Sequence, residues 1–149
     1  MTLYLIDLNV LQEMGPKGNS HVRAWLATVD DDALRLSALT FFEKREGLER
    51  ERKRRLAKGA DWADVDLKLA EIAKLETLFE DRVIPVGTKE YAEWAKLVGV
   101  KGKNQRDAGL AATARVNDLV VVTRNVKDFA GRDVRVLNPF VAKPTIVIV

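Results

Sequence analysis

The sequence predicts an α/β fold in three layers, in which a central parallel sheet of four to five strands is flanked by helices. Short apolar runs alternate along the chain with segments whose apolar residues recur at helical spacing. Strands separated by helices favour a parallel sheet with right-handed crossovers. The chain has 149 residues, 47% of them hydrophobic, with neither an internal repeat nor a dividing linker. Residues 1–149 are therefore expected to form a single domain with its own core.

The N-terminal part of the chain predicts two strands and two helices. Leu3–Ile6 is a short apolar run, typical of a buried strand. Asp7 or Asn9 can cap the short helix that follows, and a Gly-Pro pair then ends that helix. Ser20–Val29 carries its apolar residues on one helical face, and Ala33–Ser37 predicts the second strand.

The middle of the chain predicts two long helices of opposite charge. Thr40 and Glu43 have the spacing of a capping box, so the first helix is expected to start there and to run to about Lys58, before a glycine. Trp62–Phe79 has apolar residues at helical spacing and predicts the second helix. The first is strongly basic and the second strongly acidic. These charges either create a phosphate-facing surface or, as we prefer, offset one another on two solvated helices.

The C-terminal half continues the alternation. Apolar, mostly valine-rich runs predict strands at Arg82–Val86, Leu119–Thr123 and Val134–Leu137. Amphipathic or alanine-rich segments predict helices at Thr88–Val98 and Arg106–Val116, joined by the basic, glycine-containing loop Gly99–Asn104. A turn or short helical piece is expected at Asn125–Phe129, and Asn138-Pro139 breaks the chain after the last of these strands.

Four carboxylates occur in short motifs that such a sheet would gather at one edge. They are Asp7, Glu43, Asp107 and Asp128. Ligand sites in open parallel sheets lie just outside the carboxyl ends of the strands. Carboxylates pooled there repel one another unless a cation is bound. The sequence therefore predicts a site for a hard metal ion, Mg²⁺ or Mn²⁺, that serves hydrolytic chemistry.

The scarcity of cysteine and histidine limits which side chains could carry out such chemistry. The chain has no cysteine and one histidine, His21, which is expected to be an ordinary surface residue. The metal and the carboxylates would therefore carry the reaction, a design that suits phosphodiester hydrolysis. The turn after the first strand lacks the glycines that cradle nucleotide phosphates. No signal peptide and no membrane-length apolar run is recognised, and the absence of cysteine fits a reducing cytoplasm.

Each acid also has a purely structural interpretation. Asp7 could serve only as a helix cap, and Glu43 only as the acid of the capping box. Asp107 could complement a helix dipole from the first turn, and Asp128 could stabilise a turn. Singly, each of these roles is as reasonable as a catalytic one. Jointly they leave unexplained why all four acids fall at one edge of the sheet.

The motifs around these acids resemble those of PIN-domain ribonucleases, in particular the VapC-type toxins of bacterial and archaeal toxin–antitoxin pairs. The resemblance runs from Leu3 to about Phe140. Beyond YLIDLNV at the first strand, it rests on T-x-x-E-x-x-x-G (Thr40 to Gly47), D-x-x-x-A-A-T-A (Asp107 to Ala114), T-R-N-x-x-D-F (Thr123 to Phe129) and L-N-P-F (Leu137 to Phe140). Their order and spacing make the combination far more specific than any one motif.

The resemblance implies a PIN-like fold, endonucleolytic cleavage of RNA with Mg²⁺ or Mn²⁺, a homodimer and a neutralising antitoxin. It implies that the four acids form one catalytic quartet and that Asp7 and Asp107 bind the metal directly. The polar residues expected to support the acids by hydrogen bonding are Asn9, Thr123 and Asn125. The basic residues expected to contact the RNA backbone are Arg106 and Arg124. An arginine on an antitoxin tail would be able to enter the acidic pocket and displace the metal.

Two features depart from the family pattern. Many members carry a small hydroxyl residue after the first acid, where this chain has Leu8, so that role is either missing or filled by Asn9. Residues 142–149 form an apolar C-terminal extension beyond the closing motif. We expect Thr145–Val149 to add an edge strand, paired with this chain's own sheet, with a dimer mate or with the antitoxin.

Two other functions compete with the ribonuclease. A catalytically silent module of the same fold would bind RNA or protein, although such a surface has no need of an anionic pocket that faces phosphates. An aspartyl phosphatase would use Asp7 as its nucleophile. That class usually needs a second aspartate two residues later, where this chain has Asn9.

Overall fold

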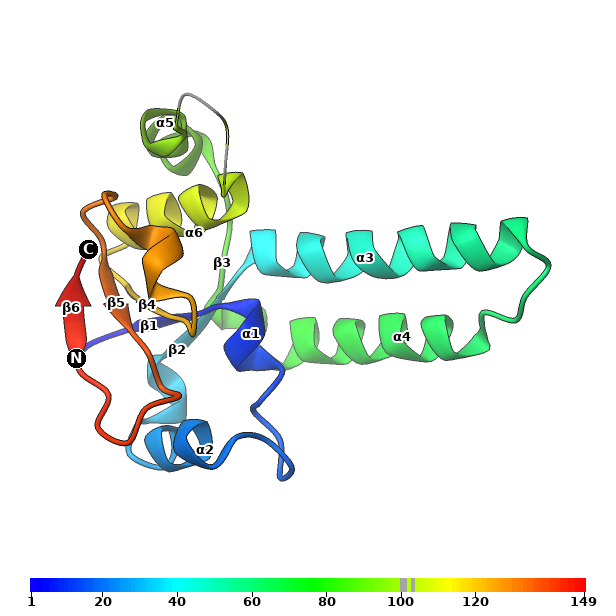
Figure 1. Ribbon diagram of the computed structural model, residues 1–149, viewed down its shortest axis with the longest axis horizontal. Helices are drawn as coiled ribbons and strands as arrows, with labels where there is room; N and C mark the ends of the chain where they lie inside the picture. The colour runs from blue at the N-terminus through cyan, green and yellow to red at the C-terminus, as the bar shows by residue number, and fades with distance from the viewer. Residues whose placement is uncertain (100–101, 103) are drawn as a thin grey trace.

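The computed structural model describes residues 1–99, 102 and 104–149 and contains one six-stranded sheet (Figure 1). The strands are β1 (Tyr4–Ile6), β2 (Leu34–Ser37), β3 (Val83–Ile84), β4 (Val120–Val122), β5 (Arg135–Leu137) and β6 (Ile146–Ile148). Their order across the sheet is β3-β2-β1-β4-β5-β6, and only β6 runs antiparallel to its neighbour. Five parallel strands bear out the α/β prediction, and β6 raises the total above the four to five expected.

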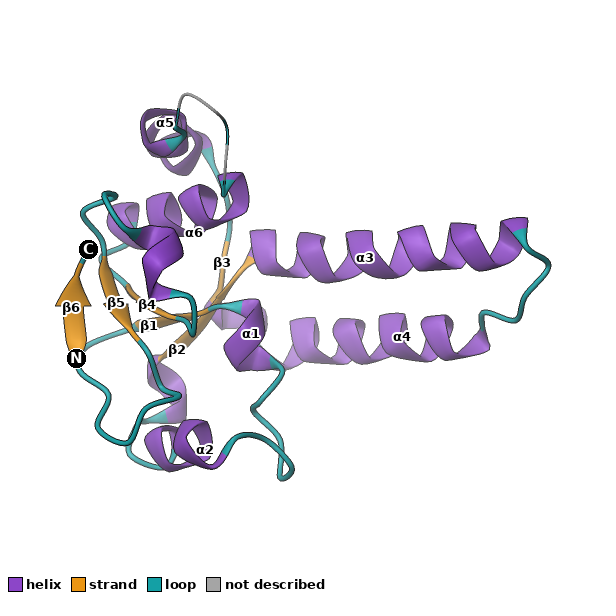
Figure 2. Cartoon of the chain, viewed as in Figure 1, coloured by secondary structure: helices purple, strands orange, loops and turns teal. Residues whose placement is uncertain are grey.

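Helices cover both faces of this sheet (Figure 2). They are α1 (Leu8–Leu11), α2 (Ser20–Leu26), α3 (Ala38–Ala57), α4 (Ala63–Leu78), α5 (Thr88–Leu97) and α6 (Gln105–Val116). Short 3₁₀ turns lie at η1 (Asp31–Ala33), η2 (Glu80–Arg82) and η3 (Val126–Phe129). Of the helices in the described part of the chain, none is long and apolar enough to cross a membrane.

Alternate residues of the central strands belong to two separate hydrophobic clusters. Ile6 and Val122 join the cluster that includes residues of α1, α2 and the α3–α4 pair. Leu5 and Val121 join the cluster beneath α6, with Phe129 of η3. Successive side chains of a strand point to opposite faces, so both faces of this sheet are buried. The three layers expected from the sequence are therefore present.

Helices α3 and α4 form a long antiparallel hairpin that projects from the body of the molecule (Figures 1 and 2). Arginines on α3 form ion pairs with acids on α4, namely Arg45 with Glu76, Arg52 with Asp66 and Arg55 with Asp64. The opposite charges of the two predicted helices thus offset one another across the hairpin, which confirms the preferred interpretation for this inner face. Partly exposed pairs of this kind contribute about 1 kcal/mol or less each.

The start of α3 corrects one prediction from the sequence. The helix begins at Ala38, and the N-cap is Ser37, whose side chain accepts a hydrogen bond from the backbone N–H of Leu39 at 3.1 Å. Thr40 is therefore buried inside the first turn rather than capping it, and Glu43 is not the acid of a capping box. Because Ser37 is both the last residue of β2 and the cap of α3, the helix starts directly from the end of the strand.

The apolar tail pairs with the chain's own sheet, the first of the three partners considered for it. Strand β6 lies antiparallel to β5, with Val136 opposite Val147. Val134 and Val149 extend the pairing through two backbone hydrogen bonds of 3.1 Å. The predicted basic loop Gly99–Asn104 includes residues 100, 101 and 103, which lie outside the described part of the chain.

Candidate active site

The four predicted acids come from four elements that meet at the carboxyl ends of the parallel strands. Asp7 follows β1, and Glu43 lies in the second turn of α3, which begins directly after β2. Asp107 lies in the first turn of α6, and Asp128 lies in η3, shortly after β4. Since β1 is flanked by β2 and β4, Asp7 occupies the centre of this edge.

Asp7 is held on both carboxylate oxygens. Oδ1 accepts a 2.7 Å hydrogen bond from the backbone N–H of Leu8, which makes Asp7 the N-cap of α1. Oδ2 accepts a 2.7 Å bond from the hydroxyl of Thr123 and a 3.3 Å bond from Nδ2 of Asn9. The cap of α1 therefore uses only Oδ1, while Oδ2 is held by Thr123 and Asn9.

Two polar side chains beyond Leu8, those of Thr123 and Asn9, hydrogen-bond to Asp7. Leu8 has no hydroxyl, but Thr123, directly after β4, is fully buried and points its Oγ1 at Asp7. Asn9 contacts the same two groups, at 3.3 Å from Asp7 Oδ2 and 3.4 Å from Thr123 Oγ1. The backbone N–H of Asn125 donates to Thr123 Oγ1 at 3.1 Å. Asn125 thus contributes its main chain to this network, where the sequence pointed only to its polar side chain.

The remaining acids are coupled to Asp7 by repulsion. Burial raises the pKa of Glu43 to about 7, and the charges of Asp7, Asp107 and Glu46 raise it as well, while Arg106 acts in the opposite direction. Burial also raises the pKa of Asp107 to about 6, with contributions from Asp7 and Asp128. Burial raises the pKa of Asp7, and the charge of Asp128 raises it further, although the hydrogen bonds from Thr123 and Leu8 act to lower it. Asp7 and Asp107 therefore lie within electrostatic reach of each other, and each lies within reach of one or more of the other two acids: Glu43 interacts with both, and so does Asp128.

Two residues that the sequence did not single out belong to this region. Arg132 donates to the backbone carbonyl of Asp128, and its charge lowers the pKa of Asp107. Glu46, one turn after Glu43, forms ion pairs with Arg106 and with Arg50. The only signal for Glu46 was its spacing of three residues from Glu43 on a helix. Arg132 lies in a loop outside every motif and gave no such signal.

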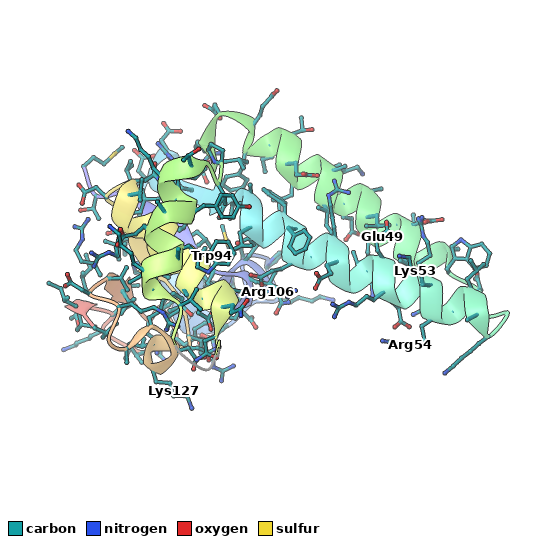
Figure 3. The ribbon with its side chains drawn as sticks, turned by 90° about the horizontal axis from the view of Figure 1, so that it is seen from above. Glu49, Lys53, Arg54, Trp94, Arg106 and Lys127 are labelled. Carbon is teal, nitrogen blue, oxygen red and sulfur yellow. The ribbon has the colours of Figure 1, made fainter. Side chains whose placement is uncertain are left out.

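The two predicted RNA-contacting arginines differ in their surroundings. Arg106 lies beside the first turns of α3, paired with Glu46 and 5.9 Å from the ring centroid of Phe42 (Figure 3). Arg124 follows β4, and its guanidinium lies 4.9 Å from the ring centroid of Phe140. The backbone N–H of Arg124 donates to Oδ1 of Asn9 at 3.2 Å. Both arginines are exposed at the rim of the acidic edge.

The donor set suits a hard divalent cation. Within the described residues, no three acidic, histidine or cysteine side chains converge into a ready-made coordination sphere. Mg²⁺ takes only one or two carboxylates directly and keeps several waters, so it does not need such a cluster. Burial, and to a smaller extent the neighbouring acids, disfavour the charged forms of Glu43 and Asp107 and so raise their pKa values. A divalent cation bound at Asp7 and Asp107 would favour the charged forms.

A groove leads from the acidic edge onto the hairpin. It has a volume of about 610 Å³ and is lined by Leu8 and Gln12 of the α1 segment and by residues of α3 and α4. Glu43 lies in this lining together with Leu48, Ile72 and Leu75. The groove therefore joins one acid of the site to a mainly apolar surface.

A family model described as the PIN domain matches residues 4–133. The toxin FitB of Neisseria gonorrhoeae is 31% identical over 144 residues, which cover 93% of this chain and 99% of FitB. All four acids lie inside the matched range, whereas β5 and β6 lie beyond it.

Solved structures give the same relationship in three dimensions. The structure of FitAB bound to an IR36 DNA fragment has a chain with 28% identity and a TM-score of 0.73, covering 95% of this chain and 98% of that one. FitAcB from Neisseria gonorrhoeae gives 29% identity and a TM-score of 0.72, with coverages of 93% and 99%. DNA-bound VapBC from Salmonella typhimurium, at 19% identity and a TM-score of 0.60 with coverages of 91% and 97%, shares the fold.

Proposed function

The chain belongs to the PIN-domain family, and from that premise we propose that it is a metal-dependent endoribonuclease, the toxin of a toxin–antitoxin pair. It would hydrolyse RNA phosphodiester bonds at Asp7, Glu43, Asp107 and Asp128 and act in the cytoplasm. The observation that carries the proposal is the placement of these four acids at one edge of the sheet, where Asp7 and Asp107 interact electrostatically with each other and with both Glu43 and Asp128. A purely structural role for each acid would not require that coupling.

Each residue of the site has a task in this proposal. Asp7 and Asp107 would hold Mg²⁺ or Mn²⁺, which when bound neutralises a scissile phosphate and acidifies a water molecule. Thr123 and Asn9 would fix the orientation of Asp7, since both donate to its Oδ2. Glu43 would hold or release a proton near neutral pH, because its pKa is raised to about 7. Arg106 and Arg124 would contact RNA phosphates at the rim.

The test is RNA cleavage by purified protein freed of any partner, with Mg²⁺ or Mn²⁺, beside EDTA and an Asp7→Asn variant. Cleavage that needs the metal and is lost in the variant would support the proposal. A folded protein that binds Mn²⁺ and cleaves none of transfer, ribosomal and messenger RNA would favour the silent binding module. Trapping of a phosphoaspartate at Asp7 would instead favour a phosphatase.

We propose that the antitoxin occupies the groove of Glu43, Leu48, Ile72 and Leu75. The groove is mainly apolar and opens toward the acidic edge, so a peptide that fills it could also place a basic side chain among the acids. The relative FitB is a toxin, and a solved structure with the same fold, at 20% identity and a TM-score of 0.60, is a toxin–antitoxin complex from Klebsiella pneumoniae. In a purified complex, Mn²⁺ binding should weaken, and Leu75→Lys should release the antitoxin. A complex that binds Mn²⁺ as the free protein does would contradict this.

We also propose a homodimer, for which the best surface lies between α3 and α5. An apolar pocket of about 360 Å³ there is lined by Leu39, Phe42, Val86, Tyr91 and Trp94, with Ala38. Phe42 and Tyr91 are more than half exposed in the single chain. Light scattering should give the mass of a dimer for the unaltered protein and of a monomer for Tyr91→Lys. A monomeric unaltered protein would contradict the proposal.

A further inference from the structure

The outer face of α3 carries a row of basic residues that begins at the acidic site. Arg50, Lys53, Arg54 and Lys58 are all exposed, in contrast to the partly buried Arg45, Arg52 and Arg55 that pair with α4. At 100° per residue, Arg50 and Arg54 lie within about 20° of the helical position of Glu43. The name "basic stripe" is used below for Arg50, Lys53, Arg54 and Lys58.

The basic stripe is continuous with the site at its inner end. Glu46 pairs with Arg106 at the rim of the site and, at 3.3 Å, with Arg50, the first residue of the stripe. Figure 3 places Arg106 beside the first turns of α3 and Lys53 and Arg54 on its outer half. A rise of 1.5 Å per residue puts Lys58 about 22 Å along the helix from Glu43. The cations therefore run outward from the acids as a broad track, in which Lys53 and Lys58 lie about 80° and 60° to either side of the helical position of Glu43.

The charge of this track remains available to a ligand. Three acids of α4, Asp64, Asp66 and Glu76, are already paired with the inner arginines of α3, so they do not neutralise the outer face. Arg54 pairs with Glu51 and Arg50 with Glu46, but both arginines are highly exposed, with side-chain exposures of 61% and 71%. Exposed pairs are weak and exchange readily for stronger partners such as phosphate.

We infer that the basic stripe is a track for the phosphate backbone of single-stranded RNA that leads away from the scissile bond. This rests on the proposed ribonuclease function and adds that the substrate extends for several nucleotides beyond the cut. An isolated row of cations would attract any polyanion. Its continuity with Glu43 through Arg106 and Arg50 assigns it to the polyanion whose bond is cut at the acids.

The test compares the triple variant Arg50→Gln, Lys53→Gln, Arg54→Gln with a matched triple variant, Arg23→Gln, Lys89→Gln, Lys143→Gln. The control removes the same charge from three exposed positions on other elements. Binding of a fluorescein-labelled, unstructured RNA is followed by anisotropy in EDTA over a salt series. Each lost phosphate contact should lower the slope of log affinity against log salt by roughly 0.7, so the stripe variant should lose about 2 and the control nothing.

A cleavage assay, and binding assays with duplex DNA and with the antitoxin, distinguish the possible results. With metal, the stripe variant should show a raised KM on a long RNA at an unchanged kcat, since the stripe touches no reacting atom. Equal salt slopes for all three proteins would overturn the track, even if RNA is cleaved. If the stripe variant had a reduced salt slope but the unaltered protein cleaved no RNA, the stripe would still be an RNA-binding track, and the proposed nuclease function would be refuted. Loss of affinity only for duplex DNA or for the antitoxin would reassign the stripe and overturn the inference.

Discussion

The hydroxyl of Thr123 donates a 2.7 Å hydrogen bond to Oδ2 of Asp7, which joins the ends of the two central strands, β4 and β1. The two residues are 116 positions apart in the sequence. Because Oδ1 of Asp7 is occupied by the cap of α1, this bond fixes the rotation of the whole carboxylate. The orientation of Asp7 thus depends in part on a fully buried threonine.

Replacement of that hydroxyl should therefore affect the site more than the fold. We expect Thr123→Val to lower cleavage and Mn²⁺ affinity by roughly 10–100-fold, as for other residues that orient metal ligands. Thr123→Ser should retain most of both, because it keeps the donor. Cleavage rates and Mn²⁺ titration by electron paramagnetic resonance check this, with circular dichroism to verify the fold. Equal activity of the valine and serine variants would contradict a positioning role.

The acidic site should make the metal-free protein less stable as pH rises. Glu43 has a pKa raised from about 4.5 to about 7, so the folded state binds this proton more tightly than the unfolded state. Stability from this group is complete below its unfolded pKa and is lost as pH rises through about 7. Asp107, with a pKa near 6, acts in the same direction. In EDTA, Tm should fall between pH 4.5 and 8, and less so in Glu43→Gln.

The control for this pH dependence is Glu80→Gln, an exposed acid of η2 far along the chain from the site motifs. It should follow the unaltered protein at every pH. Added Mg²⁺ or Mn²⁺ should raise Tm more at pH 8 than at pH 5, because deprotonated acids bind metal and protonated ones do not. If Tm changed with pH in the same way in Glu43→Gln and in the unaltered protein, Glu43 would not be the cause of the pH-dependent loss of stability.

Hydrophobic periodicity was sufficient to predict the strands and helices because each has a strong local signal. The predicted helix Trp62–Phe79 became α4, Ala63–Leu78, and the predicted strand Leu119–Thr123 became β4, Val120–Val122. The predicted start of α3 was wrong because serine and threonine are both good caps, and the chain uses Ser37 while Thr40 packs inside the first turn. Cap choice depends on tertiary packing, which the local sequence does not contain.

The candidate site was predictable to the extent that topology dictated it. Any acid at the carboxyl end of a parallel strand meets its counterparts there, so the convergence of Asp7 and Asp128 followed from the fold class. The contribution of Arg132 could not be predicted from the fold class, because its approach to Asp128 and Asp107 depends on the path of an irregular loop. The main-chain role of Asn125 could not be predicted either, since almost every residue has the same backbone N–H donor.

Close packing at Gly109 of α6 should make that helix intolerant of a methyl group. A Cβ there would lie 2.8 Å from ring atoms of Trp94 and 2.9 Å from Cδ2 of Leu39. We expect Gly109→Ala to cost about 1–3 kcal/mol of unfolding free energy by overpacking. It should also lower cleavage, since it shifts the helix that carries Asp107. Gly47→Ala in α3 is the control, because a Cβ there meets nothing within 4 Å.

The two glycines should thus respond with opposite signs. Gly47→Ala should stabilise the protein by about 0.5–1 kcal/mol, because alanine loses less backbone entropy in a helix. Urea denaturation of both variants measures the difference. A destabilised Gly47→Ala would mean that α3 needs the glycine for backbone reasons, and an unchanged Gly109→Ala would mean that α6 and Trp94 adjust freely.

Strand β6 should protect the edge of the sheet, so its removal should promote self-association. Deletion of Thr145–Val149 exposes the backbone groups of β5 that now pair with β6, and it removes Val149 from the cluster beneath α6. An uncovered edge strand is a template for pairing with other chains. We expect a lower Tm and a larger mass by light scattering. Ile148→Lys, at a side chain that is 69% exposed, should keep the edge paired and the mass unchanged. A truncated protein with the same Tm and mass would show that β6 is dispensable and that β5 is a tolerated edge.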